Sequence, residues 1–347
     1  MAEERSGGGG VCRRREEAVK TDSAHSRART PAAAMAVATT PMETGHQDVV
    51  HDCQLDYYGT RLATCSSDRT VKVFSVSGSP DAPSQSHLAD LSGHEGPVWQ
   101  VAWAHPKFGS LLATCGYDHK VIVWREAEGS QGRSWTQVYV SPATLHDSSV
   151  NSVCWAPHEL GLMLASASSD GSVAVLAYND QTGEWDSKKL SGAHTLGALA
   201  VSWSPAASAG ALVGVAQGAA PVRRLVSAGC DNTLKVWVQQ AVGGEWALEH
   251  TLSAHSDWVR DAAWAPNIGL PKNTIASASQ DGTVQIWTQA DAGAAWTNVQ
   301  LHNFGAPVWR VSWSVTGNIL AVSDANNQVT LWKEAIDGQW TQVQSVQ

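Results

Sequence analysis

The sequence predicts an all-β protein, a six-bladed β-propeller, and three observations point to this fold. A tight-turn segment recurs six times along the chain, a strand that ends in Trp recurs between the turns, and Trp is unusually abundant. The chain has 347 residues and contains seventeen Trp but only three Phe. Because an indole is large and its N–H needs an acceptor, this bias indicates a recurring site built to hold Trp.

The first repeated element is a short strand that follows an Asp-containing turn. Its five clear copies are SSDRTVKVF (66–74), GYDHKVIVW (116–124), SSDGSVAVL (168–176), GCDNTLKVW (229–237) and SQDGTVQIW (279–287). A weaker sixth copy, DANNQVTLW (324–332), has Asn326 in place of Asp and is preceded by Val322 in place of Ser or Thr. Alternating apolar residues predict strands rather than helices.

The second repeated element is a Gly-His or Ala-His corner that leads into a strand ending in Trp. Its copies include GHEGPVWQVAW (93–103), LHDSSVNSVCW (145–155), AHTLGALAVSW (193–203) and AHSDWVRDAAW (254–264). HNFGAPVWRVSW (302–313) is the same pattern with two added residues, and GHQDVVHDCQL (45–55) is a copy without Trp. A further Trp follows each turn from the second onward. Four short strands in each unit of about 40–45 residues are typical of propeller blades.

These units resemble WD repeats and cover about residues 45–340. In that family a corner His, a strand Ser or Thr, a turn Asp and a strand Trp form a hydrogen-bonded structural chain. The resemblance implies five such sets here: His46, Thr64, Asp68; His94, Thr114, Asp118, Trp124; His146, Ser166, Asp170; His194, Ser227, Asp231, Trp237; and His255, Ser277, Asp281, Trp287. Phe74 and Leu176 stand where Trp is usual in the first and third units.

Each of these sets imitates a Ser-His-Asp catalytic triad. An active site occurs once, however, whereas this constellation occurs five times, so satisfaction of buried polar groups is the better reading. We therefore predict no enzymatic activity and no catalytic, cofactor-binding or metal-binding residues. Trp99, Trp258 and Trp309 lie outside the sets, just after the corners and near a propeller face; partner binding and ordinary packing are equally compatible with their positions.

Composition limits the remaining function classes. The formal net charge of −9 argues against nucleic acid or an anionic membrane as the main partner. The six Cys form no C-x-x-C pair, which favours a reducing compartment, the cytosol or the nucleus. Residues 1–34 are rich in Gly, Ala and Arg and are expected to be a disordered extension, so the propeller is assigned to 35–347. The Ala- and Gly-rich stretch at about 205–224 is expected to be a mobile loop.

A more specific resemblance comes from loops as well as from repeat positions. HDCQLDYYGTRLATCSSDRTVKVF, HDSSVNSVCWAPHELGL and AHSDWVRDAAWAPNIGLP, with LWKEAIDGQW near the end, resemble the secretory protein thirteen family. That family comprises small WD-repeat subunits of the outer cage of vesicle coat complex II. The resemblance implies a six-bladed open propeller that a partner's N-terminal segment completes with a seventh blade.

The same resemblance implies the partners and their locations. They are the α-solenoid cage subunit at the cytoplasmic face of the endoplasmic reticulum and on coat vesicles, a scaffold nucleoporin of the nuclear pore Y-complex, and subunits of the lysosomal GATOR assembly, which relays amino-acid supply to the growth kinase TOR. Membrane association would be peripheral and through partners only. An alternative function is a peptide-reading adaptor that uses the propeller face.

The repeats themselves agree with an open ring, because there are six units and no seventh, and the last unit lacks the polar set. An unpaired sheet edge is a template for an added strand. We therefore expect the partner at two edges. One is the first-blade edge, including Val71, Val73 and the strand before His46; the other is the last-blade edge, including Val329 and Leu331.

Overall fold

The computed structural model describes residues 41–79, 82–129, 132–206, 222–239, 241, 243–267, 272–290 and 293–346. The chain divides into two compact units, Met1–Met35 and Ala36–Gln347, and the described residues all belong to the second. The predicted extension at 1–34 and most of the predicted mobile loop at 205–224 lie outside the described residues. None of the helices described has the length and apolar character needed to cross a bilayer.

Six four-stranded antiparallel sheets form the blades, as predicted, and each is built from four consecutive strands. In chain order, the strands of blades one to three are β1 (Val50–Leu55), β2 (Arg61–Ser66), β3 (Thr70–Ser79), β4 (Ala82–Ser92), β5 (Val98–Trp103), β6 (Leu111–Gly116), β7 (Val121–Gly129), β8 (Gly132–Val140), β9 (Val150–Trp155), β10 (Met163–Ser168), β11 (Val173–Asn179) and β12 (Glu184–Leu190). Those of blades four to six are β13 (Ala198–Trp203), β14 (Arg223–Gly229), β15 (Thr233–Gln239), β16 (Trp246–Ser253), β17 (Val259–Trp264), β18 (Asn273–Ser279), β19 (Thr283–Gln289), β20 (Thr297–Asn303), β21 (Val308–Trp313), β22 (Ile319–Asp324), β23 (Val329–Glu334) and β24 (Trp340–Val346).

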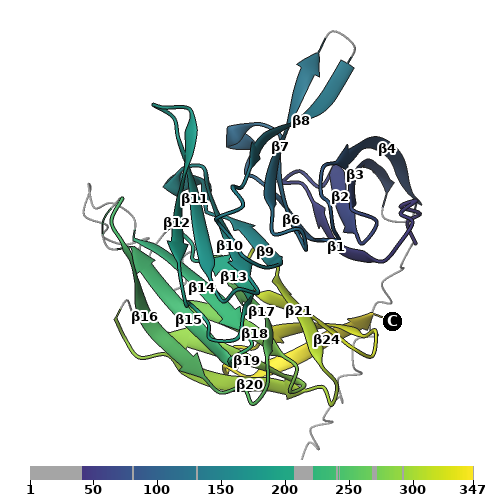
Figure 1. Cartoon of the computed structure of the whole chain (residues 1–347). Coiled ribbons are helices and arrows are strands. Elements are labelled where there is room, and N and C mark those ends of the chain that lie inside the picture. Colours follow the sequence, from purple (N-terminus) through teal and green to yellow (C-terminus); the bar gives the residue numbers. More distant parts are fainter. Residues whose placement is uncertain are drawn as a thin grey trace, which may run out of the picture. The chain divides into compact units, whose positions relative to one another are not determined.

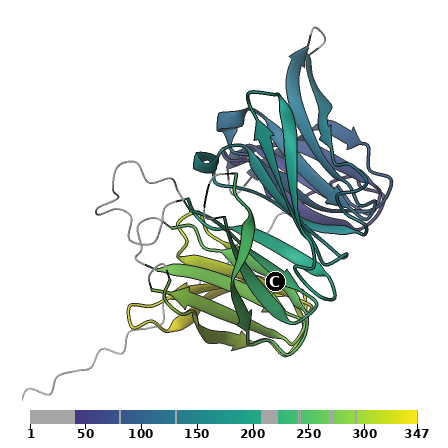
Figure 2. The ribbon, with the colours of Figure 1, turned by 60° about the vertical axis from the view of Figure 1, so that its left-hand side comes forward.

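The first strand of each blade lies innermost. β1, β5, β9, β13, β17 and β21 pack in chain order, each against the next, and together they line a central channel. Figures 1 and 2 show the blades following one another from purple at β1 to yellow at β24. Two short 3-10 helices, η1 (Pro106–Phe108) and η2 (His158–Leu160), connect the first two strands of blades two and three.

The turn between the second and third strands of every blade depends on one left-handed residue after the Asp position. These residues have φ between 59° and 80° and are Arg69, His119, Gly171, Asn232, Gly282 and Asn327. The Asp carboxylate holds the turn, since Oδ1 of Asp68 accepts the backbone N–H of Thr70 at 2.9 Å. Gly171 is also required for space, because a Cβ there would lie 2.2 Å from the carbonyl oxygen of His194.

The hydrophobic core is divided into five clusters, each lying between two consecutive blades. One face of blade two, for example, buries Ala113, Cys115 and Val123 against Leu164 and Leu176 of blade three. Equivalent clusters join blades one and two, three and four, four and five, and five and six. We call these five interfaces the closed seams. Among the described residues no such cluster joins blade six to blade one, and we call that interface the open seam.

Candidate functional site

The five predicted polar sets are assembled inside their blades. In blade four, His194 Nδ1 lies 2.8 Å from Asp231 Oδ1 and its Nε2 lies 2.8 Å from Ser227 Oγ. The indole of Trp237 completes the set by donating to Ser227 Oγ at 3.0 Å. In the other four sets the His Nε2 likewise lies 2.8 or 2.9 Å from the hydroxyl oxygen. In three of them, those of blades one, two and five, the His Nδ1 also contacts the Asp carboxylate, at 2.8 or 3.0 Å.

The electrostatics of these sets follow from burial and hydrogen bonding. Burial opposes ionisation of Asp231. The hydrogen bond and charge of His194, together with hydrogen bonds from Thr233 and Thr195, outweigh it and hold the pKa of this carboxyl well below its usual range. Blade three differs, because His146 Nδ1 lies 3.7 Å from Asp170 and 3.1 Å from Ser172 Oγ. Burial lowers the pKa of His146 to about 4, and the attraction of Asp170 only partly offsets this.

The His, Ser or Thr, and Asp of these polar sets are not arranged for acyl transfer. The hydroxyls of Thr114, Ser166 and Ser227 have no solvent exposure, so no substrate carbonyl can reach them. Where a Trp is present, its indole N–H occupies a lone pair of that same hydroxyl. The sets therefore act as internal hydrogen-bond networks that fix each turn and corner.

Blade six replaces the polar set with an apolar arrangement. Phe304 occupies the corner position, so the expected two-residue insertion in 302–313 is not present; the backbone N–H of Phe304 bonds the carbonyl of Gly282 at 2.8 Å, as that of His194 bonds Gly171. Trp332 donates to Thr330 Oγ1 at 2.8 Å, and Asp324 holds the turn through the N–H of Asn326 at 2.9 Å. The last blade thus lacks the His-centred network.

A second Trp series stands at the end of every inner strand except β1, and in four blades it fastens the blade to the one before it. Sequence analysis found this series but not its role. The indole N–H donates to a backbone carbonyl of the preceding inner strand in four blades: Trp103 to Gln54 at 3.0 Å, Trp155 to Ala102 at 2.8 Å, Trp203 to Cys154 at 3.0 Å and Trp313 to Ala263 at 3.0 Å. Each inner-strand Trp also packs against the Trp of the outermost strand of its own blade, as Trp103 does against Trp135 with ring centroids 5.8 Å apart.

Blade one has no Trp at this position, and no blade precedes it in the part of the chain that the structure describes. Leu55 stands there with 52% of its surface exposed, and β1 is the most exposed of the inner strands. On the other side of the open seam, no indole among the described residues donates to the carbonyl of Ser312, the blade-six equivalent of those acceptors. Both sides of the open seam therefore lack the indole-to-carbonyl bond that fastens four of the five closed seams.

The open seam also leaves one face of blade six uncovered. β22 alternates between two kinds of residue. Leu320 and Val322 are buried and pack on blade five, whereas Ile319, Ala321 and Ser323 are only partly buried and face away from it. The register pairs Ala321 with Leu331 and Ser323 with Val329, so the four share this face. The partner-binding candidates Val329 and Leu331 thus lie on the uncovered surface, and Val329 is 37% exposed.

Two other partner-binding candidates were wrong. Val71 and Val73 have no solvent exposure, because they point toward blade two and pack in the first closed seam. The side of blade one that borders the open seam instead carries Leu55 and the half-exposed Leu62. The expected strand before His46 is absent from the described residues 41–49, where β1 begins only at Val50.

The three face-located Trp lie near one mouth of the channel and differ in their contacts. Trp99 is half-buried, packs edge-on against His51 and donates to Ser149 Oγ at 2.8 Å. Trp258 and Trp309 are each 43% exposed, and their rings lie on Arg260.

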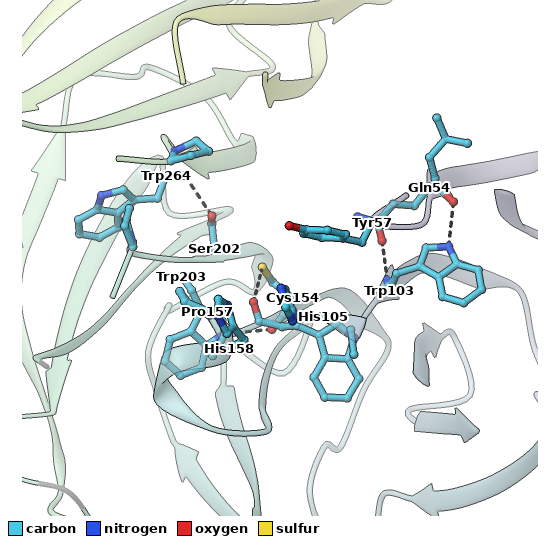
Figure 3. Close-up of a pocket in the computed structure, with 16 residues that line it drawn as sticks. Gln54, Tyr57, Trp103, His105, Cys154, Pro157, His158, Ser202, Trp203 and Trp264 are labelled. Carbon is cyan, nitrogen blue, oxygen red and sulfur yellow. Dashed lines mark hydrogen bonds between the residues drawn. The ribbon is translucent and has the colours of Figure 1, made fainter. Parts of the chain in front are cut away.

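The opposite mouth is hollowed into a cavity of about 480 Å³, shown in Figure 3. His105 and His158, which precede and begin the two 3-10 helices, stack there with ring centroids 4.0 Å apart. Burial raises the pKa of the Cys154 thiol in its wall to about 11, so the thiolate needed for nucleophilic chemistry is scarce. No group of three or more His, Cys, Asp or Glu among the described residues is placed to hold a metal ion.

Comparison with known proteins agrees with this architecture. The family model for the WD domain, G-beta repeat, matches residues 39–75, 85–125, 139–175, 246–288 and 298–333. The chain is 52% identical over 304 residues to the protein SEC13 homolog of Drosophila melanogaster, covering 87% of this chain and 82% of that protein.

Two fungal relatives extend the comparison. The chain is 47% identical over 344 residues to the protein transport protein SEC13 of Mycosarcoma maydis, covering 86% of this chain and 92% of that protein. It is 48% identical over 318 residues to the protein transport protein sec13 of Emericella nidulans, covering 90% of this chain and 100% of that protein. The chain therefore belongs to the WD-repeat proteins and, among them, to the SEC13 family.

Proposed function

We propose that this chain is a non-enzymatic scaffold subunit of the outer cage of ER-to-Golgi transport vesicles, and that a partner protein completes its ring. The observation that carries the proposal is the open seam, since within the described residues the six blades share only five apolar cores. The names of the fungal relatives, protein transport proteins, support the transport role.

The chemistry of the open seam defines what a partner must supply. Its uncovered surfaces are the flat faces of two sheets, so the partner must stack a sheet between them rather than pair only with an edge. Apolar side chains would cover Ile319, Ala321 and Leu331, as blade three covers the equivalent face of blade two. A Trp at the end of the donated inner strand would find its acceptor in the carbonyl of Ser312.

The partner that we propose is the N-terminal segment of the α-solenoid cage subunit, which would add a seventh blade. The scaffold nucleoporin of the Y-complex and a GATOR subunit are the corresponding partners at the nuclear pore and at the lysosomal surface. Because there is one open seam, these partners would exclude one another on a given molecule. The chain would reach membranes only through them.

The test is co-expression of the full chain with the N-terminal segment of the cage subunit, followed by size-exclusion chromatography with light scattering. We expect a one-to-one complex. Ala321→Arg places a charge on the uncovered face and should abolish the complex, because the desolvated guanidinium would have no partner. Ser187→Arg, on the exposed outermost strand of blade three, is the matched control and should bind like the unmodified chain. A chain that stays monomeric with the segment, or an Ala321→Arg variant that still binds, would contradict the proposal.

A further inference from the structure

Every inner strand carries a β-bulge at its second residue. The register shifts by one residue between Val50 and Asp52 in blade one, and the same shift recurs in the other five blades. A bulge turns the extra side chain out of the regular alternation of a strand and is common beside functional sites. The six bulged residues are His51, Trp99, Asn151, Leu199, Arg260 and Trp309.

These six side chains meet at one place. Together with Arg310 they line a cavity of about 340 Å³ at the mouth of the central channel opposite the one in Figure 3. The residue before each bulge is apolar in all six blades: Val50, Val98, Val150, Ala198, Val259 and Val308. The bulged positions instead differ in chemistry from blade to blade, so the repeated frame presents a set of unlike side chains.

Arg260 is held rigidly in this cavity. Its Cζ lies 5.0 Å from the ring centroids of both Trp258 and Trp309, so the guanidinium is packed between two indoles. Its Nε and Nη2 donate to Gln280 Oε1 at 2.8 and 2.6 Å, which fixes the plane of the group. Among the described residues no carboxylate lies within 4.0 Å of it.

Arg310 supplies a second guanidinium deeper in the same mouth. It is half-buried, and the described residues place no carboxylate within 4.0 Å of it either, although Asp52 and Asp261 attract it from farther down the channel. Both of those carboxylates already accept backbone N–H groups, of Val101 at 3.3 Å and of Val311 at 3.0 Å. The cavity lining itself contains no acidic residue, in a chain whose net charge is −9.

We propose that this mouth binds an acidic peptide segment of a protein partner, with an Asp or Glu carboxylate on Arg260 and Arg310 and a neighbouring apolar side chain against Trp309 and Leu199. Arg beside partly exposed Trp is the composition of residues that dominate binding energy in interfaces. A pre-ordered guanidinium favours planar carboxylate recognition because little conformational entropy is lost on binding. The site lies at the channel mouth, whereas the surfaces proposed for the seventh blade are the sheet faces of blades one and six. His51 and Trp309 stand on the two inner strands that border the open seam.

The cavity favours a peptide over a nucleic acid. Two guanidinium groups in an otherwise uncharged, aromatic-lined hollow can pair with one or two carboxylates, whereas a nucleic-acid backbone requires a basic surface along its length. The six bulged side chains differ in chemistry, which also suits a short peptide whose successive side chains differ.

The experiment pans a displayed library of short random peptides on the full chain, and the enriched peptides are then measured by fluorescence anisotropy. We expect enrichment of Asp or Glu beside an apolar residue, and loss of binding when that acid is changed to Asn or Gln. Arg260→Gln should weaken binding by about tenfold or more, which corresponds to about 1.4 kcal/mol. Arg125→Gln removes the same charge from an exposed position on β7 and should leave binding unchanged. Excess inorganic phosphate should not displace the peptide, whereas displacement would identify a simple anion site.

Several outcomes would overturn the proposal. They are the absence of any enriched peptide, enrichment of peptides without acidic residues, or affinities that Arg260→Gln does not change. Trp309→Ala gives a second, independent test of peptide affinity, because it removes one wall of the cavity without changing the net charge. It should also weaken binding, and full affinity in both variants would exclude this mouth as the site. Circular dichroism and urea unfolding of each variant establish that the fold is retained.

Discussion

Blade two and blade six present the same sheet face to very different surroundings. In blade two this face carries Leu111, Ala113 and Cys115 on β6, all nearly or fully inaccessible because blade three covers them. In blade six the equivalent residues are Ile319, Ala321 and Ser323 on β22, and all three are only partly buried. A seventh blade is the structural unit that would give blade six the neighbour that blade two already has.

The closed seams show how the ring of blades is held together. Each closed seam combines an apolar core with polar contacts between inner strands, such as Val153 N–H to Gln100 Oε1 at 2.8 Å. An indole-to-carbonyl bond is added in four of the five. When one blade is missing from such a ring, the two sheet faces that would flank it still carry apolar side chains that can pack. The hydrogen-bond donors and acceptors that its inner strand would supply are absent.

The largest expected effect comes from placing a charge on each of the two faces. Ala113→Arg buries a guanidinium in a closed seam without a partner and should destabilise the fold by more than about 3 kcal/mol. Ala321→Arg should change the free energy of unfolding of the isolated chain by less than about 1 kcal/mol, since its side chain can reach water. Urea unfolding followed by Trp fluorescence measures both. Similar losses for the two variants would mean that the open seam is not open.

The second effect is the pH dependence of stability. We expect it from blades that contain a buried corner His and not from blade six, where Phe304 replaces that His. The folded-state pKa of His146 is about 4 against about 6.5 in the unfolded chain, so the unfolded state binds the proton first. The stability that comes from keeping His146 neutral is complete above pH 6.5 and is lost as the pH falls toward 4. Between pH 7 and pH 5 we expect a loss of about 2 kcal/mol from this group. The pH slope should be smaller in His146→Asn, and an unchanged slope would refute the assignment.

A smaller effect should distinguish the inner-strand Trp from its counterpart at the open seam. Trp155→Phe removes the donor to the carbonyl of Ala102 and should cost about 1 kcal/mol or somewhat more. Leu55→Trp introduces an indole where no preceding blade offers a carbonyl, so the isolated chain should be almost unaffected. Thermal unfolding of both variants provides the measurement. A stabilised Leu55→Trp variant would indicate that blade six approaches blade one closely enough to accept the new bond.

The smallest effect is expected for a surface ion pair that spans the last closed seam. Lys272 Nζ lies 2.7 Å from Glu334 Oε1, and both side chains are about one-third exposed. Because solvent screens such pairs, Lys272→Met should change the free energy of unfolding by no more than about 0.5–1 kcal/mol. A larger loss in chemical denaturation would show that the fifth seam depends on charge more than on its apolar core.

Sequence reasoning was most successful where function depends on spacing within one repeat. The His194, Ser227 and Asp231 positions were assigned from the resemblance to WD repeats, because the corner and the turn are each recognisable even though an insertion separates them in this blade. Phe304 was missed as the corner of blade six because pattern matching looked for His, and the apolar replacement carries no polar signal.

Features that involve two blades could not be predicted in the same way. Alternation places Val71 and Val73 on one face of their strand, but it does not say whether that face meets the next blade or the missing one. The carbonyl acceptors of Trp103 and Trp155 lie about fifty residues away in the preceding blade. That geometry depends on how sheets stack, which a single repeat does not encode.

The most direct test of the open seam is hydrogen–deuterium exchange on the full chain, alone and with the N-terminal segment of the cage subunit. We predict stronger protection of β1, β22 and β23 in the complex, with the protection of β6 and β10 in the closed seams unchanged. Protection that rises equally in every blade, or only at the channel mouth that carries Arg260, would contradict the claim that the partner fills the open seam.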